Sequence, residues 1–276
     1  MKKQAILVTI IGLCHRKMQL KENYDLIENG YAVIPFPKYI KDIIKSNILE
    51  KVAIKTNSNL NINSSIEEIT ESVCSMDENA FRISFSKPER NLSGSAVDSI
   101  LKYVRNISKS LGGKISDINY LSPREIKSNE CFNERTYDLP WRCVRPNKID
   151  VGAAHADYQF WDINDNTDLD PLCPIDYDQR WKVWVPLFGC NNSNSIQFIS
   201  GSHKEEVPFI IRENDGNIKP DIDHDWLDSN ESKFICPFDS FDENCVIFHD
   251  RLIHRGPKNL CNHIRISNEF TILLKI

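Results

Sequence analysis

Two residues whose types and spacing suit metal chemistry lie near the middle of the chain, in the segment KIDVGAAHADYQFW. His155 and Asp157 are separated by a single residue. On a β-strand this spacing points both side chains to the same face, so an imidazole and a carboxylate could meet one metal ion. Iron(II) oxygenases combine such a pair with a second histidine from elsewhere in the fold. The pair therefore predicts a metal site whose third ligand is distant in sequence.

Other histidines compete for a place in this site. His203 and Glu205 form a second histidine–acid pair in SGSHKEE, but its Gly and Ser residues are typical of a turn, so we interpret that pair as structural. The candidates for the third ligand lie near the C-terminus, in FHDRLIHRGPKNLCNHIRIS, which contains His249, His254 and His263. Residue types alone leave the choice among these three open.

The same C-terminal segment contains an arginine suited to a dicarboxylate. If such a co-substrate chelates the metal, its far carboxylate needs a buried cation with bidentate geometry, which favours arginine over lysine. Arg265 in the strand-like run IRIS meets this need. Ser267 follows two residues later on the same strand face, where its hydroxyl could share the carboxylate.

The second half of the chain must supply the elements that carry these residues. After Gly113 the sequence consists of short β-rich runs separated by Pro, Asn, Asp and Gly. Their number and spacing favour a sandwich, jelly roll or barrel over a parallel α/β sheet. We therefore predict a β core over residues 113–276.

Helical patterns dominate the preceding part of the chain, residues 18–112. The clearest covers 95–111 and begins with Ser95 and Asp98 at capping-box spacing. No repeat and no Pro- or Gly-rich linker separates the two parts, so we predict that the helices pack on the outside of the β unit and that 18–276 is one domain.

Composition limits the partners and the compartment. The 276 residues carry a formal net charge of −5, without the basic stripe that binds phosphates, so nucleic acid is not an expected partner. Nine cysteines occur without a C-x-x-C pair, which argues against a zinc ribbon and a disulfide framework and favours a reducing cytoplasm. The oligomeric state is not indicated.

The N-terminal residues 1–17 are ambiguous. MKKQAILVTIIGLC resembles a signal peptide, but bulky Leu13 stands where a small residue should precede cleavage, and basic side chains follow. No other segment approaches the length that a bilayer requires, so no membrane association is expected. We treat 1–17 as an extension and predict a cytoplasmic protein.

Four ordered signals carry a family resemblance. They are the H-x-D at His155 and Asp157, the segment WVPLFGCNNSNSIQFISGSHK, the distal His254, and Arg265 eleven residues beyond it. Residues 141–276, and more loosely the chain from Met18, resemble the phytanoyl-CoA dioxygenase family of iron(II)- and 2-oxoglutarate-dependent oxygenases. The ordered set is more specific than any single piece.

This resemblance implies a mainly β fold, a double-stranded β-helix or cupin-like jelly roll, with the helical N-terminal portion packed on one sheet. It assigns iron(II) to His155, Asp157 and His254, and 2-oxoglutarate to Arg265 with Ser267. Trp184 matches a family position that contacts 2-oxoglutarate, although a plain core role fits a strand Trp equally well.

The implied activity is hydroxylation of a C–H bond of a small-molecule substrate, with 2-oxoglutarate and oxygen converted to succinate and carbon dioxide. Because the carboxylate Asp157 is present, the site that a halide would need is occupied, so hydroxylation, desaturation or ring closure is favoured over halogenation. A jelly-roll metal-binding protein without oxygenase activity, such as an isomerase or sensor, is the alternative.

The substrate itself is not indicated, because loops determine it. Four polar residues near the motifs could face the pocket, although each could equally be exposed or structural, and their basic members would suit an anionic metabolite. They are Arg142, Arg145, Gln159 and Arg255. The acidic segment 162–178 lacks calcium-loop spacing, and we interpret it as a solvated lid over the iron mouth.

Overall fold

A computed structural model describes residues 25–86, 88–110, 114–117, 139–160, 179–214 and 217–275. The N-terminal extension 1–17 and the lid predicted over 162–178 lie outside these residues, as does the glycine stop predicted at 112–113. Within the described ranges, no helix combines the length and the apolar character needed to cross a membrane.

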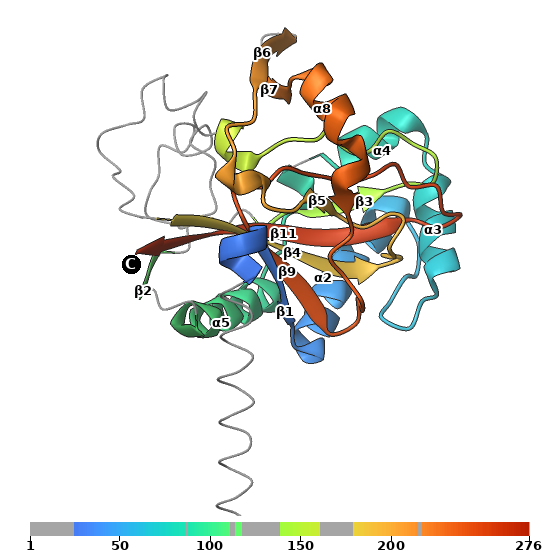
Figure 1. The fold of residues 1–276 in the computed structure, drawn as a ribbon. Coiled ribbons are helices and arrows are strands. Elements are labelled where there is room, and N and C mark those ends of the chain that lie inside the picture. Colours follow the sequence, from blue (N-terminus) through green and yellow to red (C-terminus); the bar gives the residue numbers. More distant parts are fainter. Residues whose placement is uncertain are drawn as a thin grey trace, which may run out of the picture.

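The larger of the sheets has six strands and runs through the middle of the molecule (Figure 1). Its order is β1-β9-β4-β11-β2, and β3 also pairs with β11. All of the pairings are antiparallel. The strands are β1 (Tyr31–Pro35), β2 (Lys114–Asp117), β3 (Trp141–Val144), β4 (Gln179–Phe188), β9 (Asn244–His249) and β11 (Arg265–Lys275).

A smaller sheet and a separate hairpin complete the β structure. The smaller sheet has the order β10-β5-β8, and the hairpin of β6 and β7 extends away from the larger sheet in Figure 1. Between β7 and β8 lie the short helices α8 (His224–Asn230) and η3 (Glu231–Lys233), while η2 (Ser202–Lys204) follows β5. The strands are β5 (Gln197–Ile199), β6 (Phe209–Asn214), β7 (Asn217–Ile222), β8 (Phe234–Ile235) and β10 (His254–Arg255).

The longer helices come from the first part of the chain, as predicted. This part contains α2 (Lys38–Thr56), α3 (Ile66–Cys74), α4 (Glu78–Ser84), η1 (Pro88–Arg90) and α5 (Ser95–Ser110). A capping box is present in α3, where the Ser65 hydroxyl accepts from the Glu68 N–H and the Glu68 carboxylate accepts from the Ser65 N–H. Helix α5 already begins at Ser95, so Ser95 is its first helical residue and not the cap that its spacing predicted.

The two faces of the larger sheet bury different side chains. Val183 and Val185 of β4 and Phe270 of β11 join a large apolar cluster with residues of α2 and α5. On the opposite face, Trp184 packs in a second cluster with Phe198 of the smaller sheet. The alternation along β4 therefore separates a helix-covered outer face from an inner face between two sheets. This is a mainly β fold with flanking helices, as the sequence predicted.

A β-bulge interrupts this alternation near the end of β4. Ile266 of β11 pairs with Phe188, whereas Ser267 pairs with Pro186, so Leu187 is the extra residue. Leu187 and Phe188 consequently both contact the outer apolar cluster although they are consecutive. Beyond the bulge, the inner-face residues of β4 lie opposite those of β11.

Candidate functional site

The two histidines predicted as metal ligands pair through their backbones. An isolated antiparallel bridge joins His155 to His254, which is the first residue of β10. Asp157, however, is the first residue of a helical turn over 157–160. The expectation that His155 and Asp157 share a strand face was therefore wrong. The two side chains converge because the chain turns directly after the bridge.

The structure brings His155, Asp157 and His254 into one cluster. One potential ligand atom from each lies within 4.8 Å of the others. The Nε2 of His254 is 3.7 Å from Oδ2 of Asp157, and the two imidazole rings are 4.4 Å apart between centroids. The cluster has the residue composition of a two-histidine, one-carboxylate iron site.

Hydrogen bonds orient both imidazoles. Nδ1 of His155 lies 2.8 Å from the carbonyl oxygen of Ala153, and Nδ1 of His254 lies 2.9 Å from that of Leu252. If each Nδ1 carries the proton, each Nε2 presents a lone pair to the centre of the cluster. A carbonyl partner on the far nitrogen is the usual arrangement for metal-binding histidines.

The electrostatics of the cluster suit a cation. Burial, reinforced by the neighbouring His155, lowers the pKa of His254 to about 4, so this imidazole is neutral at pH 7. Burial opposes ionisation of Asp157, but coulombic interactions with Lys182 above all, and with His254 and His155, outweigh it, so the pKa of Asp157 lies below its ordinary value. The site thus offers the neutral imidazole of His254 and the carboxylate of Asp157, which are protonation states that bind metal.

Asp157 also has a free oxygen directed at this cluster. Its Oδ2 is buried, and among the described residues it has no hydrogen-bond partner. A buried carboxylate oxygen without a partner is costly unless a ligand satisfies it. The residues therefore fit an iron(II) ion.

Arg265 is buried at the start of β11, on the inner face of the larger sheet. Its Nη1 donates to the carbonyl oxygen of Asn194 at 2.5 Å, while its Nε has no partner among the described residues. A Cβ placed on Gly256, two residues after His254, would lie 3.2 Å from Nη2 of Arg265. The guanidinium thus packs against the chain that follows a predicted iron ligand.

Arg265 also lacks a counter-ion in the part of the chain that the structure describes. It takes part in none of the ion pairs found there, and burial lowers its pKa. A buried guanidinium without a carboxylate is costly, and a dicarboxylate ligand would supply the missing charge. This matches the role predicted for Arg265.

Asn194 is a functional neighbour that the sequence analysis did not identify. Its side-chain amide donates to Gly189 O at 2.8 Å and to Asn259 Oδ1 at 3.2 Å, which fixes the turn after β4. Asn191 tightens the same turn, because its Oδ1 accepts from the Ser193 N–H at 2.9 Å. The Asn-rich run NNSNS carried a turn signal, but no sequence pattern shows that one of its carbonyls would accept from an arginine.

Ser267 and Trp184 lie on the inner face of the larger sheet. Ser267 is 1% exposed, and its hydroxyl has no partner among the described residues. Trp184 is buried in the inner apolar cluster, with its ring 5.6 Å from that of Phe238. Both side chains lie where a co-substrate could contact them, and for Trp184 the packing also fits a core role.

Charged residues also lie on this inner face, and two of them are additional to the predicted set. Arg142 of β3 lies opposite Ser267 and forms an ion pair with Glu269 at 2.7 Å. Lys182 of β4 places its Nζ 3.6 Å from Oδ1 of Asp157. Neither Lys182 nor Glu269 was expected at the site from the sequence, although both continue two-residue alternations, with Trp184 in β4 and with Ser267 in β11.

The other polar residues proposed for the substrate pocket have different surroundings. Arg145 is buried in ion pairs with Asp150 and Glu78 and lies over the Phe81 ring. Arg255 pairs with Glu231 at 2.7 Å and lies over a ring of β8. The structure therefore brings neither side chain into the metal cluster.

Gln159, in contrast, lies in the helical turn that begins at Asp157. It is buried, and its Oε1 accepts from the Ala156 N–H at 3.3 Å. Its Nε2 has no partner among the described residues. This leaves both N–H donors of the side-chain amide free for a ligand.

The remaining histidines of the C-terminal run lie outside the cluster. Nδ1 of His249 accepts from the Arg251 N–H at 3.1 Å, and its ring packs edge-on against Trp181. Nδ1 of His263 lies 3.1 Å from Oδ1 of Asn262. His203 belongs to the short helix η2, and its Nε2 contacts Ile27 O at 3.1 Å, which fits the turn predicted there.

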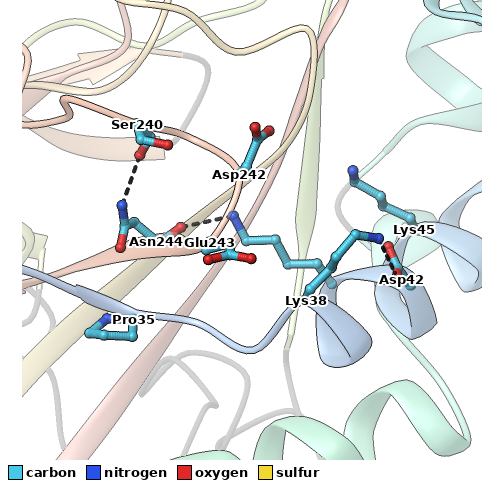
Figure 2. A pocket seen from close by; sticks show the side chains of 9 residues that line it. Pro35, Lys38, Asp42, Lys45, Ser240, Asp242, Glu243 and Asn244 are labelled. Atoms are coloured by element: carbon cyan, nitrogen blue, oxygen red, sulfur yellow. Dashed lines mark hydrogen bonds and ion pairs between the residues drawn. The ribbon is translucent and has the colours of Figure 1, made fainter.

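A cavity of about 690 Å³ lies elsewhere, between α2 and the chain that precedes β9 (Figure 2). Three lysines of α2 line it, and the buried one, Lys41, donates to Phe241 O at 2.6 Å and to Asn244 O at 2.8 Å. None of the residues predicted for the metal or co-substrate site lines this cavity.

The chain is similar to several solved structures, and the match to EctD supports the fold. EctD from S. alaskensis, solved with 2-oxoglutarate and 5-hydroxyectoine, matches with a TM-score of 0.50 and 12% identity over 92% of this chain and 75% of that chain. The carbocyclase SnoK from nogalamycin biosynthesis matches with a TM-score of 0.45 and 13% identity over 92% and 83% of the two chains. EvdO2 from Micromonospora carbonacea var. aurantiaca, solved with 2-oxoglutarate, matches with a TM-score of 0.46 and 12% identity over 93% of this chain and 90% of that chain.

The sequence comparisons identify the family. No curated protein sequence matches the chain significantly. A family model described as phytanoyl-CoA dioxygenase matches residues 124–267, which is more than half of the 276 residues. The matched segment contains all four signals on which the resemblance depended, and the prediction is confirmed. The chain belongs to the phytanoyl-CoA dioxygenase family and is an iron(II)- and 2-oxoglutarate-dependent oxygenase.

Proposed function

We propose that this oxygenase hydroxylates a C–H bond of a small anionic metabolite, with iron(II) held by His155, Asp157 and His254. The observation that carries the residue assignment is the buried, unpartnered Oδ2 of Asp157, 3.7 Å from His254 Nε2. When bound, iron(II) supplies oxygen activation coupled to decarboxylation of 2-oxoglutarate to succinate and carbon dioxide. The protein's part is to position the reactants and to exclude water.

Arg265 is proposed to anchor the far carboxylate of 2-oxoglutarate. Its guanidinium is held by the Asn194 carbonyl, has a free Nε, and lacks an ion-pair partner among the described residues. Ser267 on the same strand face contributes a free hydroxyl, and Trp184 lies on the adjoining strand opposite Glu269. Retention of Asp157 favours hydroxylation, desaturation or ring closure over halogenation, and of these we propose hydroxylation.

For the substrate, Arg142 and Gln159 are the proposed contacts. The Arg142 side chain is 42% exposed although it is paired with Glu269, so it can reach both the site and a ligand. Gln159 has a buried free amide donor. We leave Arg145 and Arg255 out of the pocket because their charges are already paired.

We further propose that residues 18–276 form one cytoplasmic catalytic domain. Strand β1 belongs to the same sheet as β4 and β11, which supports a single unit that includes the N-terminal part. The six cysteines that the structure describes are free thiols, which is typical of a reducing compartment.

Anaerobic addition of iron(II) and 2-oxoglutarate tests the assignment. The wild type is expected to develop the metal-to-ligand charge-transfer band of chelated 2-oxoglutarate, and Arg265→Ala to need at least about 30-fold more 2-oxoglutarate, because a buried charge pair is lost. Arg145→Ala, which removes a buried arginine from a different ion-pair cluster, is the control. Iron binding without 2-oxoglutarate binding would instead favour a metal-binding isomerase or sensor.

A further inference from the structure

Lys182 reaches from the inner face of β4 to one oxygen of Asp157. Its Nζ lies 3.6 Å from Oδ1, and the two side chains are 16% and 17% exposed. The other oxygen, Oδ2, lies 3.7 Å from His254 Nε2 and is without a hydrogen-bond partner among the described residues. The two oxygens of one carboxylate therefore face different groups, a lysine and the metal cluster.

The ion pair between Arg142 and Glu269 leaves the charge of Lys182 free to interact with Asp157. Glu269 is close enough to Lys182 for the ammonium to lower its pKa, but its Oε1 is already bound by two nitrogens of Arg142, at 2.7 Å and 2.8 Å. Two N–H groups on one carboxylate form a strong charge-assisted contact. With Glu269 neutralised by Arg142, the charge of Lys182 is directed to Asp157.

We propose that Lys182 is a positioning residue that keeps Asp157 monodentate. This inference rests on the proposed iron site. By holding Oδ1, the ammonium offers only Oδ2 to the metal. A two-histidine, one-carboxylate site must leave room for a chelating 2-oxoglutarate and for oxygen, and a bidentate carboxylate would occupy one of those open positions. Outer-shell partners of metal ligands commonly fix their orientation in this way.

Metal binding in the absence of 2-oxoglutarate and substrate tests this role. Lys182→Met is expected to raise the dissociation constant for iron(II) by about 10–100-fold, which is the usual effect of losing an outer-shell partner. Lys182→Arg should restore most of the affinity. Lys182→Gln, which keeps a donor but not the charge, replaces the Met variant if that variant fails to fold.

A matched control comes from α2. Lys55 forms an ion pair with Glu89 at 2.6 Å, and its side chain is 15% exposed, which is close to the value for Lys182. Lys55→Met therefore removes a comparably buried lysine charge away from the site, from a partner carboxylate that is 55% exposed, and its metal affinity should equal that of the wild type. All titrations are performed well below the melting transition of each apo variant.

Counting the coordinated waters separates positioning from a general structural role. With manganese(II) bound in place of iron(II), the water-proton relaxivity reports the number of open positions. If Asp157 becomes bidentate in Lys182→Met, one of the positions is lost and relaxivity should fall by about a third. Lys55→Met should show no such change.

The outcomes distinguish this inference from the proposed function. If the wild type binds neither iron(II) nor manganese(II), both fail. If the wild type binds metal and Lys182→Met binds it equally tightly with unchanged relaxivity, the positioning role alone is overturned. The positioning role also fails if Lys182→Met changes only the Michaelis constant of a substrate, because Lys182 would then be a substrate contact.

Discussion

His155 and His254 exchange backbone hydrogen bonds, His155 N–H to His254 O at 3.0 Å and His254 N–H to His155 O at 2.9 Å. The distance between the two imidazoles is therefore set by main-chain pairing and not by side-chain contacts. This arrangement holds two predicted iron ligands in register before any metal binds. A site organised in this way loses little conformational entropy when the ion arrives.

Replacing His254 by alanine should abolish metal binding and preserve the fold. The backbone bridge does not need the imidazole, whereas the metal loses one of its three protein ligands, so the affinity should fall by more than the roughly 100-fold limit for outer-shell changes. Iron(II) titration and far-ultraviolet circular dichroism measure the two effects. His263→Ala, outside the cluster, should bind iron(II) normally. Tight iron binding by His254→Ala would refute the triad.

Gly256→Ala should weaken 2-oxoglutarate binding specifically. The new methyl group would lie 3.2 Å from Nη2 and 3.3 Å from Nη1 of Arg265, so the guanidinium must shift by a few tenths of an ångström. A displaced carboxylate anchor should raise the dissociation constant of 2-oxoglutarate roughly threefold to tenfold, with iron affinity unchanged.

Gly152→Ala is the control for this experiment, because a Cβ at Gly152 meets no atom within 4 Å. It should bind 2-oxoglutarate like the wild type. Equal 2-oxoglutarate affinities for both alanine variants would mean that the Arg265 guanidinium does not hold the co-substrate.

Lys41 should make stability depend on alkaline pH. Burial, the largest influence, lowers its pKa from 10.5 to about 8, while Nζ donates to the carbonyls of Phe241 and Asn244. Between pH 8 and 10.5 the unfolded chain therefore binds a proton that the folded protein has lost, and stability rises with pH. The neutral amine still has two N–H groups for the two carbonyls.

Urea unfolding at pH 7 and pH 10 measures this effect. The free energy of unfolding of the wild type should gain on the order of 1–3 kcal/mol relative to Lys41→Met over this interval. Taking the difference cancels the titration of tyrosines and thiols that both proteins share. Parallel pH profiles would show that Lys41 is protonated equally in the folded and unfolded states.

Glu269→Gln should destabilise the protein by leaving Arg142 and Lys182 with one fewer negative charge between them. Breaking a fully buried pair costs about 3–5 kcal/mol, and the 42% exposure of the Arg142 side chain reduces this to about 1–3 kcal/mol. Thermal unfolding measures the loss. Adding Arg142→Met to Glu269→Gln should recover part of the lost stability, because neither charge is then left unpaired. If the double variant instead loses as much stability as the two single variants together, Arg142 and Glu269 do not stabilise each other.

The sequence predicted the site better than it predicted the local structure that builds it. The pair His155 and Asp157 was interpreted through strand geometry, yet Asp157 starts a helical turn. The same three residues nevertheless lie together in the structure, because the ordered family signals do not depend on how the intervening residue bends. Likewise, Ser95 and Asp98 have capping-box spacing but the box occurs at Ser65, since spacing alone does not show where the first helical turn begins.

Contacts between residues far apart in the chain could not be predicted from the sequence. The alternation of Lys182 with Trp184 could have placed both on one face, but only the register of β4 against its neighbours shows that this face meets Asp157. In the same way, nothing local indicates that the carbonyl of Asn194 accepts from Arg265, because 71 residues separate them. Contacts of this kind depend on topology, whereas periodicity reports only local exposure.

The bulge at Leu187 limits where residues can be inserted into or deleted from this chain. The bulge places two consecutive residues on the outer face, so the alternation of side chains between the two faces of β4 shifts by one residue there. Deleting one residue between Trp184 and this point would turn Lys182 and Trp184 toward the helices and Val183 toward the predicted metal site. Insertions and deletions should therefore accumulate in the loops that contact substrate, while β4 keeps a fixed length, so substrate choice can diversify without disturbing the oxidising centre.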